Sequence, residues 1–404
     1  MRVRILPSCA AGAVRVPPSK SVAHRMLVCA ALARGESAVR GVGDCEDVRA
    51  TLDCLCRMGA RCERAGETVK LSGGLLTAPP TEILPCRESG STLRFLIPIA
   101  LTSPYPIAFS CEGRLPRRPQ TVYERLCRER GLTFSQCGDL WQVCGQLPPG
   151  DYTVEGDISS QFVTGLLFAL PLLDGESRLR LLPPVESRPY IDLTLDVLSR
   201  FGIRAEWEDA RTLRIPSGQH YTATDCEVEG DWSSGAFWAA LGRLGENRVE
   251  MIGLDPDSKQ GDRACIPYLD ALMSGGQTIS LADQPDLGPI LFAFAAMQHG
   301  GSFSEVGRLR IKESDRIRTM EEELAKCGVI LTDLGDRVTV DASGLHAPTQ
   351  PFDGHGDHRV VMSLAILATR TGGEITGAEV VAKSYPDFWA HLASLGVSVE
   401  TLEE

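Results

Sequence analysis

The sequence repeats one pattern six times, and this repeat restricts the possible architecture more than any other feature. Each copy begins with a small polar cluster and continues as an apolar segment rich in Ala and Leu. Successive copies lie 70, 70, 74, 53 and 71 residues apart, starting at Ser19, Ser89, Ser159, Ser233, Asp286 and Asp357. Such self-similarity indicates a protein built from copies of one supersecondary unit. Scattered Ala-rich helices in an ordinary α/β protein would not recur in phase.

A second, more polar helix is predicted after each apolar helix. Its apolar residues recur every three or four positions, which gives one buried stripe, and each segment ends in Gly, a common helix stop. These segments are 51–59, 121–131, 191–202, 266–275, 315–328 and 387–396. Short β-type stretches fill the gaps at 2–6, 37–40, 68–71, 213–215, 248–251 and 338–340. Each repeat is therefore predicted to be a βαβαββ unit of about 65–70 residues.

The composition is that of a globular protein with large cores. The chain has 404 residues, of which 43% are hydrophobic and 23% charged, enough for one to three domains. No apolar run reaches the ~18 residues of a membrane span, and the start lacks a signal-peptide core, so we expect a cytoplasmic protein without membrane contact. The net charge of -12 argues against binding nucleic acid. Most of the 14 cysteines are expected to be reduced core residues.

The polar starts of the six apolar helices are the candidate binding positions. A helix N-terminus exposes backbone N–H groups and the positive end of the helix dipole. Six such starts that converge on one cleft would bind anions. For any one start, a Ser or Asp that only caps its helix is the favoured interpretation. Because several starts also carry Lys or Arg in the first turns, anion binding is favoured for the set.

Nine motifs, in order along nearly the whole chain, resemble those of the 5-enolpyruvylshikimate-3-phosphate synthase (EPSP synthase) family. They are PSKSVAHR at 18–25, ESGSTLR at 88–94, RP at 118–119, GDISSQF at 156–162, SRPYI at 187–191, QPD at 284–286, RIKESDRI at 310–317, DHR at 357–359 and AKSYPD at 382–387. Nine ordered motifs are far more specific than any one of them. The chain departs from the family pattern at Glu88, where the family has Asn, and at Phe95, where it has Pro.

The resemblance implies both a fold and a reaction. The implied fold is a two-domain inside-out α/β barrel, with three βαβαββ repeats per domain and the active site in the interdomain cleft. One domain is expected at 1–17 plus 230–404 and the other at 18–229. The implied reaction transfers the enolpyruvyl group of phosphoenolpyruvate to the 5-hydroxyl of shikimate 3-phosphate and releases phosphate. It belongs to the shikimate pathway, which leads to chorismate and the aromatic amino acids. No metal or organic cofactor is implied, and we expect a monomer.

The resemblance also implies which residues hold each substrate. The residues implied for shikimate 3-phosphate are Lys20, Ser21, Arg25, Ser159, Ser160, Gln161, Ser187, Tyr190, Asp286 and Lys312. Those implied for phosphoenolpyruvate are Lys20, Gly90, Arg118, Gln161, Arg316, Arg359 and Lys383. Both substrates carry several negative charges, so cations from both halves of the chain suit them. The same resemblance places Gly90 against the inhibitor glyphosate.

Four residues are candidates for the chemical steps. Asp286 is the candidate base for the 5-hydroxyl, and Glu313 is the candidate proton donor to C3 of phosphoenolpyruvate. Lys20 can stabilise charge on the bridging oxygen or relay a proton, and His358 can assist. The structural alternatives are a helix cap for Asp286 and a surface ion pair with a neighbouring cation for Glu313.

Two other classes of protein share part of this pattern. Enolpyruvyl transferases that act on UDP-N-acetylglucosamine carry Lys-Asn near the start and a reactive Cys shortly before Arg-Pro. Here Lys20 is followed by Ser21, and Cys111 lies seven residues before Arg118. Ring-shaped DNA clamps also contain six repeats, but basic helices line their ring, whereas the second helices here are mixed or acidic.

The segment 355–358, His-Gly-Asp-His, resembles a metal-binding cluster. It lacks the spacing of H-E-x-x-H, and no Cys pair completes it. We therefore favour a helix start that faces phosphate over a metal site.

Overall fold

The structure, a computed structural model, describes residues 1–402 and divides the chain into two compact units. Unit 1 contains Met1–Pro17 and the chain from Gly230 onward, and unit 2 contains Pro18–Glu229. The chain passes from one unit to the other after Pro17 and again after Glu229. The N-terminal segment therefore folds with the C-terminal half.

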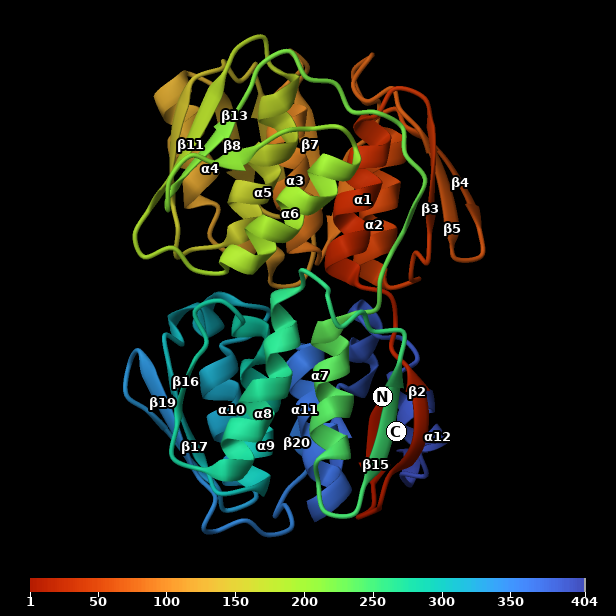
Figure 1. The fold of residues 1–404 in the computed structure, drawn as a ribbon, viewed down its shortest axis with the longest axis vertical. Coiled ribbons are helices and arrows are strands. Elements are labelled where there is room, and N and C mark those ends of the chain that lie inside the picture. Colours follow the sequence, from red (N-terminus) through yellow and green to blue (C-terminus); the bar gives the residue numbers. More distant parts are fainter. Residues whose placement is uncertain (403–404) are drawn as a thin grey trace. The chain divides into compact units, whose positions relative to one another are not determined.

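Unit 2, which is described throughout, contains three four-stranded sheets packed around its helices (Figure 1). Its helices are α1 (Lys20–Leu32), α2 (Glu46–Arg57), α3 (Gly90–Ala100), α4 (Thr121–Arg130), α5 (Ser160–Ala169) and α6 (Arg188–Arg200). One sheet has the order β14-β3-β5-β4, from Cys226–Glu227, Glu36–Arg40, Thr68–Ser72 and Arg61–Ala65. The second has the order β6-β7-β9-β8, from Leu84–Arg87, Ile107–Cys111, Leu140–Cys144 and Thr133–Cys137. The third has the order β10-β11-β13-β12, from Asp151–Glu155, Ser177–Leu182, Thr212–Ile215 and Glu206–Trp207.

Each sheet of unit 2 joins one parallel pair to an antiparallel hairpin. β6 pairs in parallel with β7, β10 with β11, and β14 with β3, and the third and fourth strands of each sheet pair antiparallel. Parallel neighbours need a crossover helix, which α3 and α5 supply in two of the sheets. The predicted βαβαββ repeat is confirmed here.

Unit 1 contains two four-stranded sheets and one two-stranded sheet among its described residues. Its helices are α7 (Trp232–Gly242), α8 (Cys265–Ser274), α9 (Gly288–Met297), α10 (Arg316–Ala325), α11 (His358–Thr371) and α12 (Phe388–Ser394). The sheet β16-β17-β19-β18 uses Thr278–Ser280, Gly301–Ser304, Arg337–Asp341 and Ile330–Asp333. The sheet β20-β21-β1-β22 uses Phe352–Asp353, Gly373–Thr376, Arg2–Ile5 and Val399–Leu402. The third sheet pairs β15 (Arg248–Ile252) with β2 (Ala11–Arg15) in parallel.

The repeat that begins at α7 is incomplete, so the prediction of six full βαβαββ units is wrong there; in the last repeat, β1 from the start of the chain supplies the fourth strand. α7 is followed by β15 and α8, and the chain then enters β16 of the next repeat without a closing hairpin. The missing hairpin explains why the fourth and fifth starts are only 53 residues apart. The N-terminal strand β2 pairs with β15 instead.

Four of the six predicted helix starts are the N-caps themselves. The side chains of these caps accept hydrogen bonds from backbone N–H groups of the first turn, and they are Ser19, Ser89, Ser159 and Asp357. Asp231, not Ser233, caps α7. Asp286 lies in the 3-10 turn η4 (Pro285–Leu287) before α9 and accepts no cap hydrogen bond from that helix. Gly131 ends α4 in left-handed conformation, as predicted.

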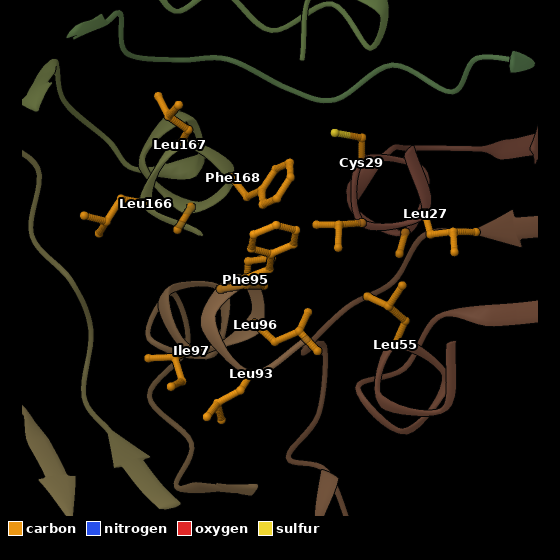
Figure 2. Close-up of a cluster of buried hydrophobic side chains, with 14 of the residues drawn as sticks. Leu27, Cys29, Leu55, Leu93, Phe95, Leu96, Ile97, Leu166, Leu167 and Phe168 are labelled. Carbon is orange, nitrogen blue, oxygen red and sulfur yellow. The ribbon is translucent and has the colours of Figure 1, made fainter. Parts of the chain in front are cut away.

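The apolar helices lie inside their units, because almost every residue of α3, α5 and α9 is buried. Figure 2 shows part of the core of unit 2, where side chains of α1, α2, α3 and α5 meet. The Phe95 ring packs edge-on against the Phe168 ring with centroids 5.4 Å apart. Aromatic pairs favour this geometry. Phe95 is therefore a contact between two central helices.

The cysteines depart from expectation at one pair. Cys56 and Cys62 form a disulfide between the end of α2 and β4, with Cα atoms 6.1 Å apart. That separation lies within the span of a disulfide. Cys29, Cys86 and Cys327 are among the buried free thiols, as predicted for core residues. In the part of the chain that is described, no helix combines the length and apolar character needed to cross a membrane.

Replacement of Phe95 by Ala tests the packing of these helices. Phe95→Ala should lower the free energy of unfolding by about 3–5 kcal/mol, because it removes a fully buried ring and leaves a cavity. Urea titration followed by circular dichroism measures the change. Leu334→Ala, at a side chain on the surface, is the control and should change stability by less than about 0.5 kcal/mol. Equal effects of the two changes would contradict the packing role.

Candidate active site

The start of α1 holds a lysine in a defined position. Lys20 donates from Nζ to Oδ2 of Asp47 on α2, at 2.7 Å, and one fifth of its side chain is exposed. The predicted ligand Ser21 follows it and is half-buried. The ammonium group is thus held at the helix start, where the dipole is positive. Sequence analysis missed Asp47, which lies on the second helix of the same repeat.

Arg25, about one turn further along α1, connects α1 to α6. Its guanidinium donates to Thr194 Oγ1 at 2.9 Å, to the Ser21 carbonyl at 2.7 Å and to the Tyr190 carbonyl at 3.1 Å. Burial lowers the pKa of Arg25 to about 10, so it remains cationic at neutral pH. The residue is 3% exposed. Arg25 therefore fixes the start of α6 beside α1, in addition to its predicted role as a ligand.

The start of α3 meets the start of α5 and the loop that carries Arg118. A Cβ placed on Gly90 would lie 2.8 Å from Nη1 of Arg118 and 3.5 Å from Oε1 of Gln161. Gln161 also donates to Ser91 Oγ at 2.8 Å. Three residues predicted to hold phosphoenolpyruvate, Gly90, Arg118 and Gln161, are therefore brought together in unit 2.

Arg94 holds this group in place through hydrogen bonds. It donates from Nη1 to Oε1 of Gln161 at 2.8 Å, from Nη2 to the Pro119 carbonyl at 2.9 Å and from Nε to Oε1 of Gln120 at 3.3 Å. Its guanidinium also lies over the Phe162 ring, 4.7 Å from the centroid. Arg94 thus connects α3 to α5 and to the residue that follows Arg118.

Further residues predicted to hold shikimate 3-phosphate lie at the starts of α5 and α6 in unit 2. Ser159 caps α5 and accepts from Gln161 N, and Ser160 begins the helix. Ser187 precedes α6 with a left-handed backbone. Tyr190 lies in the first turn of α6, and its carbonyl accepts from Arg25. Hydroxyl groups near a helix N-terminus are suitable donors to phosphate.

Unit 1 carries a second cluster, centred on Arg316 at the start of α10. The guanidinium of Arg316 donates to Asp286 at 2.8 Å, to Glu313 at 2.9 Å and to Asp357 at 2.8 Å. Its side chain is 1% exposed. Burial opposes the charge, but Asp357, Glu313 and Asp286 outweigh it and raise the pKa of Arg316. Arg316 therefore holds three carboxylates in place.

Asp286 is surrounded by cations. It lies 3.1 Å from Lys312 Nζ, 2.8 Å from Arg316 Nη1 and 3.3 Å from Arg359 Nη2. Burial pushes its pKa up, but Arg359, Lys312 and Arg316 together hold the pKa of Asp286 well below its usual range. Burial lowers the pKa of Lys312 to about 8. The interpretation of Asp286 as a helix cap is wrong, because its oxygens accept from side-chain cations.

Glu313 forms an ion pair, as the structural alternative predicted. Its Oε2 accepts from Arg316 Nη2, and about a quarter of the side chain remains exposed. The carboxylate therefore keeps access to solvent while one side is fixed. This arrangement is compatible with the predicted proton transfer.

The start of α11 brings three further predicted residues near this cluster. Asp357 caps the helix by accepting from the Arg359 backbone N–H at 3.0 Å. His358 is buried beside it, and Arg359 reaches Asp286. Lys383, at the end of η6 (Ala378–Lys383), donates to the Gly356 carbonyl at 3.2 Å. These segments of unit 1 therefore converge on Asp286 and Arg316.

Asp262, in the turn η3 (Gly261–Ala264), is a buried carboxylate that sequence analysis missed. Ser233 on α7 donates to its Oδ2. Burial, then repulsion from Asp286, raises the pKa of Asp262 to about 6. Asp262 is therefore part of the same electrostatic environment as Asp286. A short polar turn gives no sequence signal for this role.

The segment 355–358 is not arranged for a metal ion. His355 Nε2 lies 2.8 Å from Oε1 of the buried Glu323, whose other oxygen accepts from the Asp353 backbone N–H. Lys326 also pairs with Glu323 at 2.7 Å. Over residues 1–402, no group of three or more His, Cys, Asp or Glu side chains is placed to hold a metal ion. His355 instead connects the loop before α11 to α10.

Repeated α/β units with clustered cations and carboxylates at helix starts define an enzyme class suited to anionic substrates. The sequence model of one family, EPSP synthase (3-phosphoshikimate 1-carboxyvinyltransferase), matches residues 7–273 and 269–392. The chain therefore belongs to the EPSP synthase family, whose members are transferases.

Curated relatives and solved structures are similar over almost the full length. The 3-phosphoshikimate 1-carboxyvinyltransferases of Clostridium kluyveri and Clostridioides difficile are 38% and 33% identical, and each alignment covers 98% of both chains. The EPSP synthase of Acinetobacter baumannii matches with a TM-score of 0.80 at 24% identity, over 99% of this chain and 100% of that one. The enolpyruvyl transferase NikO of Streptomyces tendae matches with 0.75 at 16% identity, over 99% and 98%. At these identities the structures support the fold alone.

The His355–Glu323 contact predicts a pH-dependent contribution to stability. The hydrogen bond to Glu323 raises the pKa of His355 above the value of about 6.5 in an unfolded chain. Its stabilisation is therefore complete below about pH 6.5 and is lost as pH rises through the folded pKa. His355→Asn removes the titrating group, and Asn tolerates the left-handed backbone at this position.

Urea midpoints of the natural chain and of His355→Asn measure this contribution between about pH 5.5 and pH 9. The natural chain should be more stable than His355→Asn at the lower pH, and this difference in stability should shrink at the higher pH. A difference that is constant over the range would contradict the predicted linkage. Replacement of His346, an exposed histidine, by Asn is the control.

Proposed function

We propose that this chain transfers the enolpyruvyl group of phosphoenolpyruvate to the 5-hydroxyl of shikimate 3-phosphate. The observation that carries the proposal is the full-length similarity to 3-phosphoshikimate 1-carboxyvinyltransferases, together with a cationic or polar group at each motif position. The products are the 5-enolpyruvyl ether and inorganic phosphate. This is a step of aromatic amino acid biosynthesis.

In unit 2, the helix starts provide donors for both substrates. Ser159, Ser160, Ser187 and Tyr190 suit the phosphate and hydroxyl groups of shikimate 3-phosphate, with Ser21 and Arg25 completing this set. Gly90 leaves room for phosphoenolpyruvate beside Arg118 and Gln161. Support comes from the contacts among Gly90, Arg118 and Gln161. Lys20 is proposed to contact both substrates.

In unit 1, the groups with access to solvent are proposed to contact the substrates directly. Lys312, Arg359 and Lys383 are cations, and Asp286 is the proposed base. Arg316 is enclosed by three carboxylates, so its predicted contact with phosphoenolpyruvate requires an anionic substrate group to replace one of them. Until then its role is to position Asp286. The residues that the family resemblance implies for the two substrates come from both units.

The charge balance around Asp286 explains how a weak base can act. Three cations stabilise its ionised form and make it a poor proton acceptor. Anionic phosphoenolpyruvate would pair with Arg359 and weaken its hold on Asp286. The pKa of Asp286 then rises toward the range needed for accepting the 5-hydroxyl proton. Binding of one substrate thus prepares the base for the other.

The proposed reaction proceeds by addition and then elimination. The 5-hydroxyl oxygen bonds to C2 of phosphoenolpyruvate as its proton passes to Asp286, and C3 takes a proton from Glu313. Lys20 and the arginines stabilise the negative oxygen atoms. In the second step C3 returns a proton to Glu313, the C2–O bond to phosphate breaks, and the departing phosphate takes the proton held by Asp286. His358, at the start of α11, is proposed to assist proton movement.

The proposed partners are the two small-molecule substrates. We propose that the chain acts in the cytoplasm as a monomer, without nucleic acid or membrane and without a metal or organic cofactor. Phosphate release on mixing phosphoenolpyruvate with shikimate 3-phosphate tests the function. Release with UDP-N-acetylglucosamine and not with shikimate 3-phosphate would overturn it.

Loss of either proposed acid–base residue should affect turnover more than folding. Asp286→Ala and Glu313→Ala should each lower kcat by roughly 10²-fold or more, the scale expected for a positioned acid–base group. Steady-state phosphate release measures kcat. Asp270→Ala removes an exposed carboxylate paired with Arg243 in the same unit and should leave kcat unchanged. Near-native kcat in either active-site variant would refute that residue's role.

Gly90→Ala should weaken the binding of glyphosate more than the binding of phosphoenolpyruvate. The added methyl group would lie 2.8 Å from Arg118, and glyphosate extends slightly further than phosphoenolpyruvate. Gly90 is the first residue of α3, so the alternative that it serves a turn with positive φ is not supported. The inhibition constant should therefore rise by a larger factor than the KM for phosphoenolpyruvate.

Both constants and the melting temperature are to be measured on the single Gly90→Ala variant. A lower melting temperature with an unchanged ratio of the two constants would indicate a purely structural glycine.

A further inference from the structure

A chain of buried polar side chains runs through unit 2 from α1 to the start of α3. His24 Nδ1 lies 2.7 Å from Thr51 Oγ1, Thr51 Oγ1 lies 2.7 Å from Thr92 Oγ1, and Thr92 Oγ1 lies 2.7 Å from Ser89 Oγ. None of the four residues is more than 1% exposed. Buried polar groups are costly unless they are paired, so such a chain is a specific feature of the core. The roles proposed above for the substrates and the chemistry do not use it.

α2 joins this chain to the candidate active site through two parallel contacts. Asp47 holds Lys20 at the start of α1, and one helical turn further along both helices Thr51 holds His24. Residues four apart lie on the same face of a helix. The two contacts therefore fix α1 against α2 over a full turn. Thr51 then extends the connection to α3.

The hydroxyl groups give the chain one direction. Ser89 Oγ accepts from the backbone N–H of Thr92 as the cap of α3, and it also accepts the Thr92 hydroxyl. A hydroxyl has one proton to donate, so Thr92 can only accept from Thr51, and Thr51 can only accept from His24. His24 must then donate through Nδ1–H.

The surroundings of His24 favour this neutral tautomer. Over the described residues 1–402, the buried Nε2 has no hydrogen-bond partner, so the contact at Nδ1 decides which nitrogen carries the proton. Burial is the main cause that lowers the pKa of His24 to about 3, and Lys20 and Arg25 oppose its charge while Asp47 favours it. The imidazole is therefore neutral throughout the working pH range and serves as a fixed donor.

The chain ends where phosphoenolpyruvate is proposed to bind. Ser89 caps α3, and the next two residues are Gly90, which faces Arg118, and Ser91, which accepts from Gln161. A shift of the Ser89 cap would move the backbone N–H groups that an anion would meet at this helix start. Small displacements of positioned groups have large effects on binding and turnover.

We propose that His24, as its Nδ1–H tautomer, is a positioning residue that fixes the phosphoenolpyruvate half of the site through Thr51, Thr92 and Ser89. The proposal rests on the proposed function, because it assigns this helix start to that substrate. His24 does not contact substrate. Its effect is carried by hydroxyl groups whose direction depends on one imidazole proton.

Variants of His24 distinguish the role of its N–H donor from the role of its ring. His24→Asn keeps an N–H donor at the δ position and should stay within about twofold of the natural KM for phosphoenolpyruvate. His24→Leu removes the donor and should raise that KM about five- to tenfold, the scale of one lost buried hydrogen bond. The KM for shikimate 3-phosphate should change by less than twofold in both variants.

Three threonine-to-valine variants, which are equal in size, provide matched controls. Thr51→Val interrupts the chain and should reproduce the effect of His24→Leu. Thr194→Val removes a buried hydroxyl that contacts Arg25 and Thr164 in the same unit, and it should raise the KM for shikimate 3-phosphate instead. Thr369→Val, whose hydroxyl bonds only within α11 of unit 1, controls for lost stability and should leave both constants unchanged.

The tautomer is tested independently of turnover by ¹⁵N spectra of the seven histidine imidazoles. The signal lost in His24→Asn should show a protonated Nδ1 and no titration between about pH 5 and pH 9. A protonated Nε2 would overturn the proposal even in an inactive chain. In an active chain, equal changes in both KM values for Thr51→Val, or none, would also overturn it. Absence of phosphate release by the natural chain would instead refute the proposed function.

Discussion

The enclosure of Arg316 is the interaction on which unit 1 depends most. A buried guanidinium is costly, and removal of one partner of a buried ion pair leaves the other charge uncompensated. Here Asp286, Glu313 and Asp357 come from three separate segments of unit 1 and meet at one side chain. Their positions are therefore set by a single charge. The same contacts that stabilise the fold also orient the proposed base, so a change to Arg316 would affect both stability and the position of Asp286.

Unit 2 buries its arginines in a different way. Arg25 and Arg94 donate to carbonyl, amide and hydroxyl oxygens. Neutral partners satisfy the N–H groups but leave the positive charge in place. The charges of these two arginines lie near the helix starts of unit 2, where they favour anionic substrates. In unit 1, by contrast, the carboxylates largely balance the cations, and this balance is what allows substrate binding to change the pKa of Asp286.

The repeat, the helices and most caps could be predicted from the sequence because their signals are local. The spacing of apolar residues and the terminal Gly, as at Gly131, depend on only one turn of helix. The incomplete repeat after α8 could have been read from the short spacing of 53 residues. The partners of the site could not be predicted, because Asp47 meets Lys20 and Asp357 meets Arg316 only when separate elements pack together. Burial of the site residues could not be predicted either. Arg316 and Glu313 were assigned by motif, but only the structure shows that the arginine is enclosed and that about a quarter of the glutamate side chain is exposed.

Two of the departures from the family pattern, at Phe95 and Glu88, are compensated by their surroundings. Phe95 replaces Pro within α3 and fills the space between α1 and α5, where it packs against Phe168 and beneath the Arg25 guanidinium. Glu88 places its carboxylate against Gly113, where any Cβ would overlap it, and Gly113 itself adopts a left-handed backbone. The acidic side chain at 88 therefore depends on glycine at 113. Because residue 113 lies in the loop that leads to Arg118, the negative charge beside the anion site is tied to the placement of one of its cations.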